Sequence, residues 1–225
     1  MAEAPPSSLW SKVSKRLKKN GGSVMVMVLD DARSALRSLG GERLHPRYMP
    51  GASEAMMASV KLHHAQSEQD FADVHALAVA ELGPGLASLA EIKRVDSLTN
   101  AAIWVIRRND TVTGFLAPLA LTAAGVAALT DGTFNAARID QKWVARMGEP
   151  LAGFYCWCYA GKDQVSRGAL VLALRTLIDK HFPDLPFFGK DSTAAGAKIM
   201  RHLGFFPFDG VEHLFWRCRT VMDAA

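Results

Sequence analysis

The chain is short of cysteine, which limits the chemistry it can use. Its 225 residues include three cysteines, and two of these, Cys156 and Cys158, alternate within one apolar stretch. Three thiols at these positions neither build a disulfide framework nor match the paired spacing of zinc ligands. The sequence therefore predicts a protein of the reducing cytoplasm that binds no metal.

Long apolar runs and basic stripes are missing as well. No apolar run reaches the roughly 18 to 20 residues that a membrane-spanning helix needs, and the first residues are acidic and proline-containing, unlike a signal peptide. After residue 20 there is no basic stripe with interleaved aromatic residues, so nucleic acid is not expected as a partner. With 49% hydrophobic and 21% charged residues, the composition is that of a globular protein.

The positive charge of the chain is concentrated at its start. Residues 1–20 hold five lysines or arginines and one glutamate, a net charge of +4 that equals the formal net charge of the whole chain. Within residues 9–19 the cations share a helical pattern with apolar residues, as in helices that lie on anionic membranes, and also in ordinary solvated helices. Residues 40–55 read as a linker. We therefore expect a basic, helical N-terminal extension over residues 1–55 and one main domain over residues 56–225.

The expected elements of the main domain indicate a mixed α/β fold. A strand at 60–64 precedes helices at 67–82 and 86–95, a strand hairpin at 101–106 and 112–121, and a small helix near 126–129. Strands at 151–160, 185–189 and 211–218 then alternate with a helix that ends near 178 and a helix at 193–203. Ser67 and Asp70 have the spacing of a capping box at the start of the first helix.

We expect the stretch 151–178 to be the part around which the rest of the chain is organised. Its first half is rich in aromatic residues, as in a buried strand, and its second half repeats leucine at helical spacing. We expect a polar turn from Gly161 to Gly168 between them. Backbone N–H groups at such a turn point to one spot at the positive end of a helix dipole, and this spot favours phosphate.

With the closing segment from Lys198 to Phe205, this order of elements resembles the GNAT superfamily of N-acyltransferases. The resemblance covers about residues 58–220. It implies a mixed, mostly antiparallel central sheet flanked by helices. It also implies transfer of an acyl group from acetyl-CoA or acyl-CoA to an amine, on a small molecule or a protein, by direct attack on the thioester.

The first motif behind the resemblance is a loop that holds pyrophosphate. In the family, Gln or Arg is followed after two residues by Gly and, after one more, by Gly or Ala. Gln164, Arg167 and Ala169 take these places here, and a shift by one residue would use Gly168 instead. A guanidinium at position 167 adds a partner for phosphate oxygens. The resemblance thus assigns cofactor binding to Gln164, Val165, Ser166, Arg167, Gly168 and Ala169.

The second motif is a late helix that opens with Asn, carries Tyr near its end and closes with Gly-Phe. Thr193 takes the Asn place and is a further candidate for cofactor binding, Met200 takes the Tyr place, and Gly204 with Phe205 is intact. A thioether cannot protonate the departing thiolate, as the family's tyrosine commonly does. Two alternatives therefore stay open beside the enzyme: a regulatory or interaction module that binds acyl-CoA, and a membrane-associated enzyme that uses long acyl donors.

The resemblance places the pantetheine of the donor along the fourth strand, beside Cys156, Trp157 and Cys158. Tyr155 and Tyr159 alternate with the two cysteines, so we expect one pair to face the cleft, and either tyrosine is a candidate for the missing acid. A cysteine nucleophile would need a lowered pKa and a nearby base.

Just before this strand, Glu149 is the candidate general base, acting directly or through water. The sequence identifies neither the acceptor nor the length of the acyl chain, because the fold alone does not specify a substrate.

Overall fold

The computed structural model describes residues 55, 57, 58 and 61–218. The predicted helical extension, including the basic segment 9–19, lies outside the described residues, apart from residue 55 of the linker. The described elements are β1 (His63–His64), α4 (Glu68–Leu82), α5 (Leu89–Thr99), β2 (Trp104–Arg108), β3 (Thr111–Leu121), α6 (Ala123–Thr130), the 3-10 helix η2 (Gln141–Trp143), β4 (Gly153–Gly161), α7 (Gln164–Thr176), the π-helical turn η3 (Leu177–His181), β5 (Phe187–Lys190), α8 (Ala194–His202), β6 (Phe206–Pro207) and β7 (Leu214–Arg217).

The strands form one seven-stranded sheet in the order β1-β2-β3-β4-β5-β7-β6. Neighbouring strands are antiparallel except for β4 and β5, which run parallel. The predicted mixed, mostly antiparallel sheet is therefore confirmed. The short strand β6 was not predicted.

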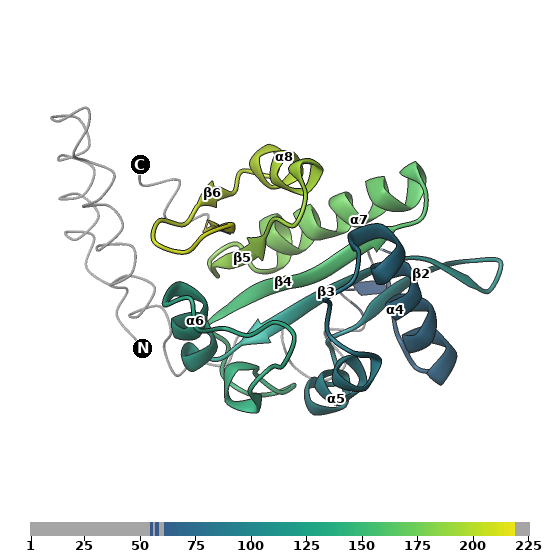
Figure 1. Ribbon diagram of the computed structural model, residues 1–225, viewed down its shortest axis with the longest axis horizontal. Helices are drawn as coiled ribbons and strands as arrows, with labels where there is room; N and C mark the ends of the chain where they lie inside the picture. The colour runs from purple at the N-terminus through teal and green to yellow at the C-terminus, as the bar shows by residue number, and fades with distance from the viewer. Residues whose placement is uncertain (1–54, 56, 59–60, 219–225) are drawn as a thin grey trace, which may run out of the picture.

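Helices cover both faces of the sheet (Figure 1). Buried residues of α4, α5 and α6 pack on one face, which we call the α4 face, together with Val105 and Phe115 of the sheet. Buried residues of α7 and α8 pack on the opposite face, the α7 face, with Phe154 and Phe187. The sheet is thus buried on both sides, which explains why β3 and β4 read as nearly continuous apolar runs.

Capping residues explain where the helices begin and end. The capping box predicted for α4 is present, with the Ser67 hydroxyl accepting from Asp70 N and the Asp70 carboxylate accepting from Ser67 N. The second helix was predicted too early, because Ser88 caps α5 and Asn100 ends it in the left-handed conformation.

A buried carboxylate joins α5 to the beginning of the sheet. Asp96 is 5% exposed, and its Oδ1 accepts hydrogen bonds from Ala102 N at 3.1 Å and Ile103 N at 3.0 Å. The same oxygen lies 3.0 Å from His64 Nε2 on β1. One side chain therefore fixes how the chain enters β2 and holds the backbone of Ile103, which lines the site described below.

We predict that Asp96→Ala lowers the free energy of unfolding by about 3 kcal/mol, because it leaves two buried backbone N–H groups without an acceptor. Urea denaturation of the variant and the parent measures the difference. Glu68→Ala is the control, since it removes a carboxylate that pairs with Lys93 on the exposed surface, and it should change stability by less than about 1 kcal/mol. Equal losses in the two variants would contradict the assigned role of Asp96.

Candidate functional site

The site is organised around β4, which loses one of its two neighbours halfway along its length. β4 pairs with β3 from Gly153 to Gly161, but it pairs with β5 only at Phe154, Tyr155 and Cys156. Within the described part of the chain, the edge of β4 that faces β5 has no strand partner from Trp157 onward. Backbone N–H and C=O groups on this edge are therefore available to another molecule.

A β-bulge lies where the two strands part. Ala117 of β3 is opposite Cys158 and Pro118 is opposite Cys156, so that Trp157 is the extra residue of β4. Proline has no N–H group to donate, and in sheets it is found at edges and bulges. Pro118 and the extra Trp157 thus interrupt the hydrogen-bonded ladder at the same place.

The bulge changes which side chains share a face. Tyr155, Trp157 and Cys158 pack on the α4 face, whereas Cys156 and Tyr159 pack on the α7 face. The expected alternation, with both tyrosines on one face and both cysteines on the other, is wrong. The physical reason is that one inserted residue reverses the direction of every following side chain.

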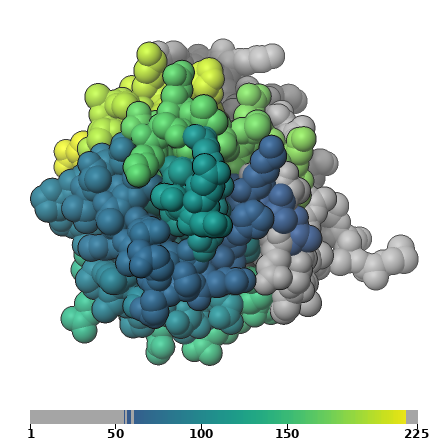
Figure 2. All heavy atoms as spheres, turned by 90° about the vertical axis from the view of Figure 1, so that its right-hand side faces the viewer, coloured from purple at the N-terminus to yellow at the C-terminus, as the bar shows by residue number. Residues whose placement is uncertain are grey.

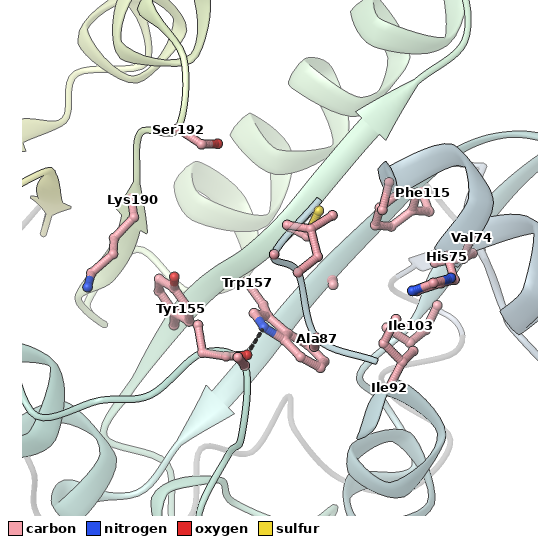
Figure 3. A pocket seen from close by; sticks show the side chains of 17 residues that line it. Val74, His75, Ala87, Ile92, Ile103, Phe115, Tyr155, Trp157, Lys190 and Ser192 are labelled. Carbon is pink, nitrogen blue, oxygen red and sulfur yellow. Dashed lines mark hydrogen bonds between the residues drawn. The ribbon is translucent and has the colours of Figure 1, made fainter. Parts of the chain in front are cut away.

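A pocket with a cavity volume of about 190 Å³ opens on the α4 face beside the bulge (Figure 3). Its floor comes from Ile103, just before β2, and from β3 and β4, and its walls come from α4, the α4–α5 connection, α5 and residues 136–137. Lys190 at the end of β5 and Ser192 in the loop after it line one side. Most of the lining side chains are aliphatic or aromatic, as is common in sites for small molecules.

Two aromatic residues give the pocket its fixed polar groups. Tyr155 is 3% exposed, and no described hydrogen bond involves its hydroxyl. Burial raises the pKa of Tyr155, so the hydroxyl stays protonated and remains a donor at neutral pH. The Trp157 indole donates from Nε1 to Ala136 O at 2.9 Å and so holds the 134–140 segment against β4.

The two thiols of β4 do not have the properties of nucleophiles. Burial raises the pKa of Cys156 to about 12, and burial together with the neighbouring Cys156 raises the pKa of Cys158. Both therefore stay protonated at neutral pH, which argues against the cysteine nucleophile. Burial also raises the pKa of Tyr159 to about 12, but this residue is on the other face of the sheet from the pocket.

The predicted pyrophosphate segment is helical from its first residue. The polar turn expected from Gly161 to Gly168 is wrong, because α7 begins at Gln164. Asp163 caps this helix: its Oδ1 accepts from Ser166 N at 2.8 Å, and its carbonyl oxygen accepts from Arg167 N at 3.0 Å. The six candidate residues 164–169 thus form the first turns of α7, with a carboxylate already at the helix start.

Ion pairs surround this carboxylate at a junction of three elements. Arg108, at the end of β2, lies 3.1 Å from Asp163, and Arg167 donates to Gly161 O at 2.8 Å and to Glu81 of α4 at 2.9 Å. Figure 2 shows this surface, where the hairpin tip in teal lies between α4 in blue and the start of α7 in green. The hydrogen bond from Ser166 N is the main cause that holds the pKa of Asp163 below its ordinary value.

The remaining predicted residues lie away from the pocket. Glu149 accepts a hydrogen bond from Arg146 N at 2.9 Å in an exposed turn before β4, and Thr193 caps α8 through Gly196 N. Met200 is a core residue of the α7 face. It packs so closely on Gly189 that a Cβ atom at this glycine would lie 2.1 Å from the Met200 methyl group.

Three pocket residues with polar side chains were missed from the sequence: His75, Lys190 and Ser192. His75 had a detectable signal, because it lies four residues after Phe71 and three before Ala78, on the apolar side of α4. Lys190 and Ser192 had none, since only the parallel pairing of β5 with β4 brings them to the bulge.

Comparison of the chain with protein-family models, with curated proteins and with solved structures finds no match. In the described part of the chain, no helix is both long and apolar enough to cross a membrane. Nor do residues 61–218 contain a cluster of three or more His, Cys, Asp or Glu side chains suited to a metal ion. The function is therefore inferred from the geometry around the bulge.

We predict that iodoacetamide alkylates Cys158 of the native protein before Cys156, because only Cys158 lines the pocket. The rate at Cys158 should still rise about tenfold per pH unit between pH 8 and 10, since its pKa is raised and the thiolate is the reactive form. Peptide mass spectrometry at timed intervals measures both thiols.

The control is the same chain in concentrated urea, where the two thiols should react alike and level off above their ordinary pKa of about 8.5. Equal labelling of both cysteines in the native state would contradict the bulge.

Proposed function

We propose that this protein is an acyltransferase that moves an acyl group from acyl-coenzyme A to an amine. The observation that carries the proposal is the parting of β4 and β5 at the Trp157 bulge, directly beside an apolar pocket. An extended chain with amide groups, such as pantetheine, is suited to the open edge of β4, because it can hydrogen-bond there as an added strand. The single parallel pair within an otherwise antiparallel sheet also supports the resemblance to the GNAT superfamily.

The reaction needs few catalytic side chains. A thioester is already activated, so the protein mainly has to hold its carbonyl carbon beside a neutral amine. The amine nitrogen attacks this carbon, the carbonyl oxygen becomes an oxyanion, and the C–S bond then breaks and releases the thiolate. Hydrogen-bond donors fixed around the carbonyl oxygen lower the barrier. Free backbone N–H groups of β4 and the protonated Tyr155 hydroxyl are the donors that we assign to this role.

Proton transfer needs a base near the amine. Among the candidates from the sequence, Glu149 already accepts a hydrogen bond within its own turn and does not line the pocket. His75 does line it, but it lies on the side of Ile92 and Ile103, away from Tyr155 (Figure 3). We therefore assign no side chain of the pocket as the base, and the amine proton passes to water; Tyr155 on β4 is the donor that faces the leaving sulfur or the oxyanion.

The phosphates of the donor are assigned to the start of α7, as the resemblance implies. Arg108, Lys162 and Arg167 supply positive charge there, and the helix dipole adds to it. Asp163 opposes them, because its carboxylate already occupies the amide of Ser166. Coenzyme A therefore has to bind beside Asp163 or displace it.

A second candidate function is an acyl-CoA-binding module without turnover. It is favoured by Met200, a buried thioether at the place where the family has its acid, and by the carboxylate cap at Asp163. The membrane-associated alternative depends on residues 9–19, which lie outside the described residues, and on the apolar stretch 115–129 with the inserted segment 122–149. Residues 115–129 run through β3 and α6 and are mostly buried.

The experiment that tests the proposal measures coenzyme A binding by calorimetry and release of free thiol from acyl-coenzyme A with a panel of amines. The enzyme predicts amine-dependent release of thiol, and Tyr155→Phe should slow it at least about tenfold, since it removes one donor to the oxyanion or the leaving group. Tyr159→Phe, on the opposite face, is the matched control and should keep the rate. Binding without amine-dependent release would favour the module, and no binding of coenzyme A would overturn both.

We predict opposite effects of two charge changes at the start of α7. Asp163→Asn should tighten coenzyme A binding about tenfold, because it removes a negative charge beside the phosphates and Asn caps a helix as well as Asp does. Gly168→Asp should weaken binding about tenfold, because it adds a carboxylate. A Cβ atom at Gly168 meets nothing within 4 Å, so this variant should fold.

Calorimetric titration of the two variants beside the parent measures the change, and far-UV circular dichroism checks that α7 is intact. Parent-like affinity in both variants would place the phosphates elsewhere.

A further inference from the structure

The pocket beside the bulge is polar and open at one end and apolar and closed at the other. Figure 3 shows Tyr155, Lys190 and Ser192 on one side of it, and Ile103 and Phe115 on the other. Lys190 and Ser192 are exposed, whereas Ile103 and Phe115 are each 1% exposed. A ligand that fills the pocket therefore has an apolar part that is buried and a polar part that reaches solvent.

The closed end has the chemistry of an aliphatic site. Besides the two residues just named, Val74, Ala78, Ile92 and Ala117 line it, and His75 is the one titratable side chain among them. An apolar cavity of about 150 Å³ is enough to hold benzene, so about 190 Å³ exceeds what the single methyl group of an acetyl donor requires. The space at the closed end therefore suits a longer chain.

The spacing between the strands indicates the length of the chain that the pocket can hold. The pocket floor runs from Tyr155 on β4 across Phe115 and Ala117 on β3 to Ile103 at the entry to β2. Two strand spacings amount to about 10 Å, and an extended alkyl chain advances about 1.3 Å per carbon, so the floor matches about eight carbons.

We infer that the pocket binds the straight aliphatic chain of a medium-length acyl group, with its carbonyl carbon beside Tyr155 and Trp157. The inference rests on the proposed function, because it assigns the acyl part of the donor. The acceptor amine then approaches from the end of the pocket where Lys190 and Ser192 are exposed.

Trp157 has a specific part in this arrangement. It lies between the two ends of the pocket in Figure 3, and its indole is fixed by the hydrogen bond to Ala136. Its position at the bulge puts an aromatic surface where the chain leaves the carbonyl and enters the closed end. The same bulge that frees the edge of β4 thus supplies one wall of the chain-binding site.

The test uses the full chain and calorimetric titration with coenzyme A, with acetyl-, butyryl- and octanoyl-coenzyme A, and with octanoate alone. Burial of each methylene strengthens binding about three- to fourfold, so octanoyl-coenzyme A should bind at least about 30-fold more tightly than acetyl-coenzyme A. Octanoate should bind without coenzyme A, because the chain site is separate from the start of α7.

Two variants fill the pocket from different sides: Ala117→Leu from the sheet and Ala87→Leu from the α4–α5 connection. Each should weaken octanoyl-coenzyme A at least about tenfold and leave binding of coenzyme A itself unchanged. Ala90→Leu is the matched control, since this alanine is exposed on α5 outside the pocket and its replacement should change neither. Using both filling variants keeps the test valid if one of them fails to fold.

The outcomes separate this inference from the proposed function. Binding of coenzyme A with no dependence on chain length would overturn the chain site and leave the acyltransferase standing. If octanoate binds, Ala87→Leu abolishes this binding, and coenzyme A does not bind, the chain site would be supported and the assignment of acyl-coenzyme A as the donor would be overturned. No binding by any of these ligands would overturn both.

Discussion

The functional geometry depends on one interruption of the central hydrogen-bonded ladder. β4 is the middle strand of the sheet, yet it gives up its pairing with β5 after Cys156 and carries an extra residue, Trp157, opposite Pro118. A complete ladder would satisfy every backbone group of β4 and leave nothing for a ligand to bind. The break is tolerated because both sides of the strand are otherwise well packed, with α4 over one face and α7 over the other. Stability is thus provided by the two covered faces, and the unpaired edge of β4 lies between them.

Those parts of the fold that depend on neighbouring residues could be predicted from the sequence. Ser67 and Asp70 cap α4 as their spacing indicates, and Thr193 caps α8. The coarse sheet also followed from the order of apolar runs and turns. The start of α7 was wrong by several residues, because the glycines were read as a turn while Asp163 has the stronger local effect as a cap. A glycine such as Gly168 is compatible with the first turn of a helix and does not by itself mark a loop.

The candidate site could be predicted only in part, since it depends on pairing between distant strands. Tyr155, Trp157 and Cys158 were identified as site residues from one stretch of sequence. That they share one face of the sheet could not be predicted, because the bulge forms only where β4 pairs with Pro118 of β3. His75, Lys190 and Ser192 reach the pocket from two separate places in the chain, α4 and the end of β5. Met200 could be recognised as unable to donate a proton. That it fills the space left by Gly189 becomes clear only when α8 packs on β5.

The two ends of the proposed donor site differ in how much binding energy they can supply. At the start of α7, the Asp163 cap uses an amide that would otherwise meet a phosphate, and its charge offsets part of the attraction from Arg108 and Arg167. At the bulge, the apolar pocket is open to a chain and contributes about 0.8 kcal/mol for each methylene that it buries. A donor with a short acyl group would gain little binding energy from the pocket, and the repulsion between its phosphates and Asp163 would not be offset. In the proposed donor site, a longer chain would offset that repulsion, so the acyl chain would be the main source of affinity and of selectivity.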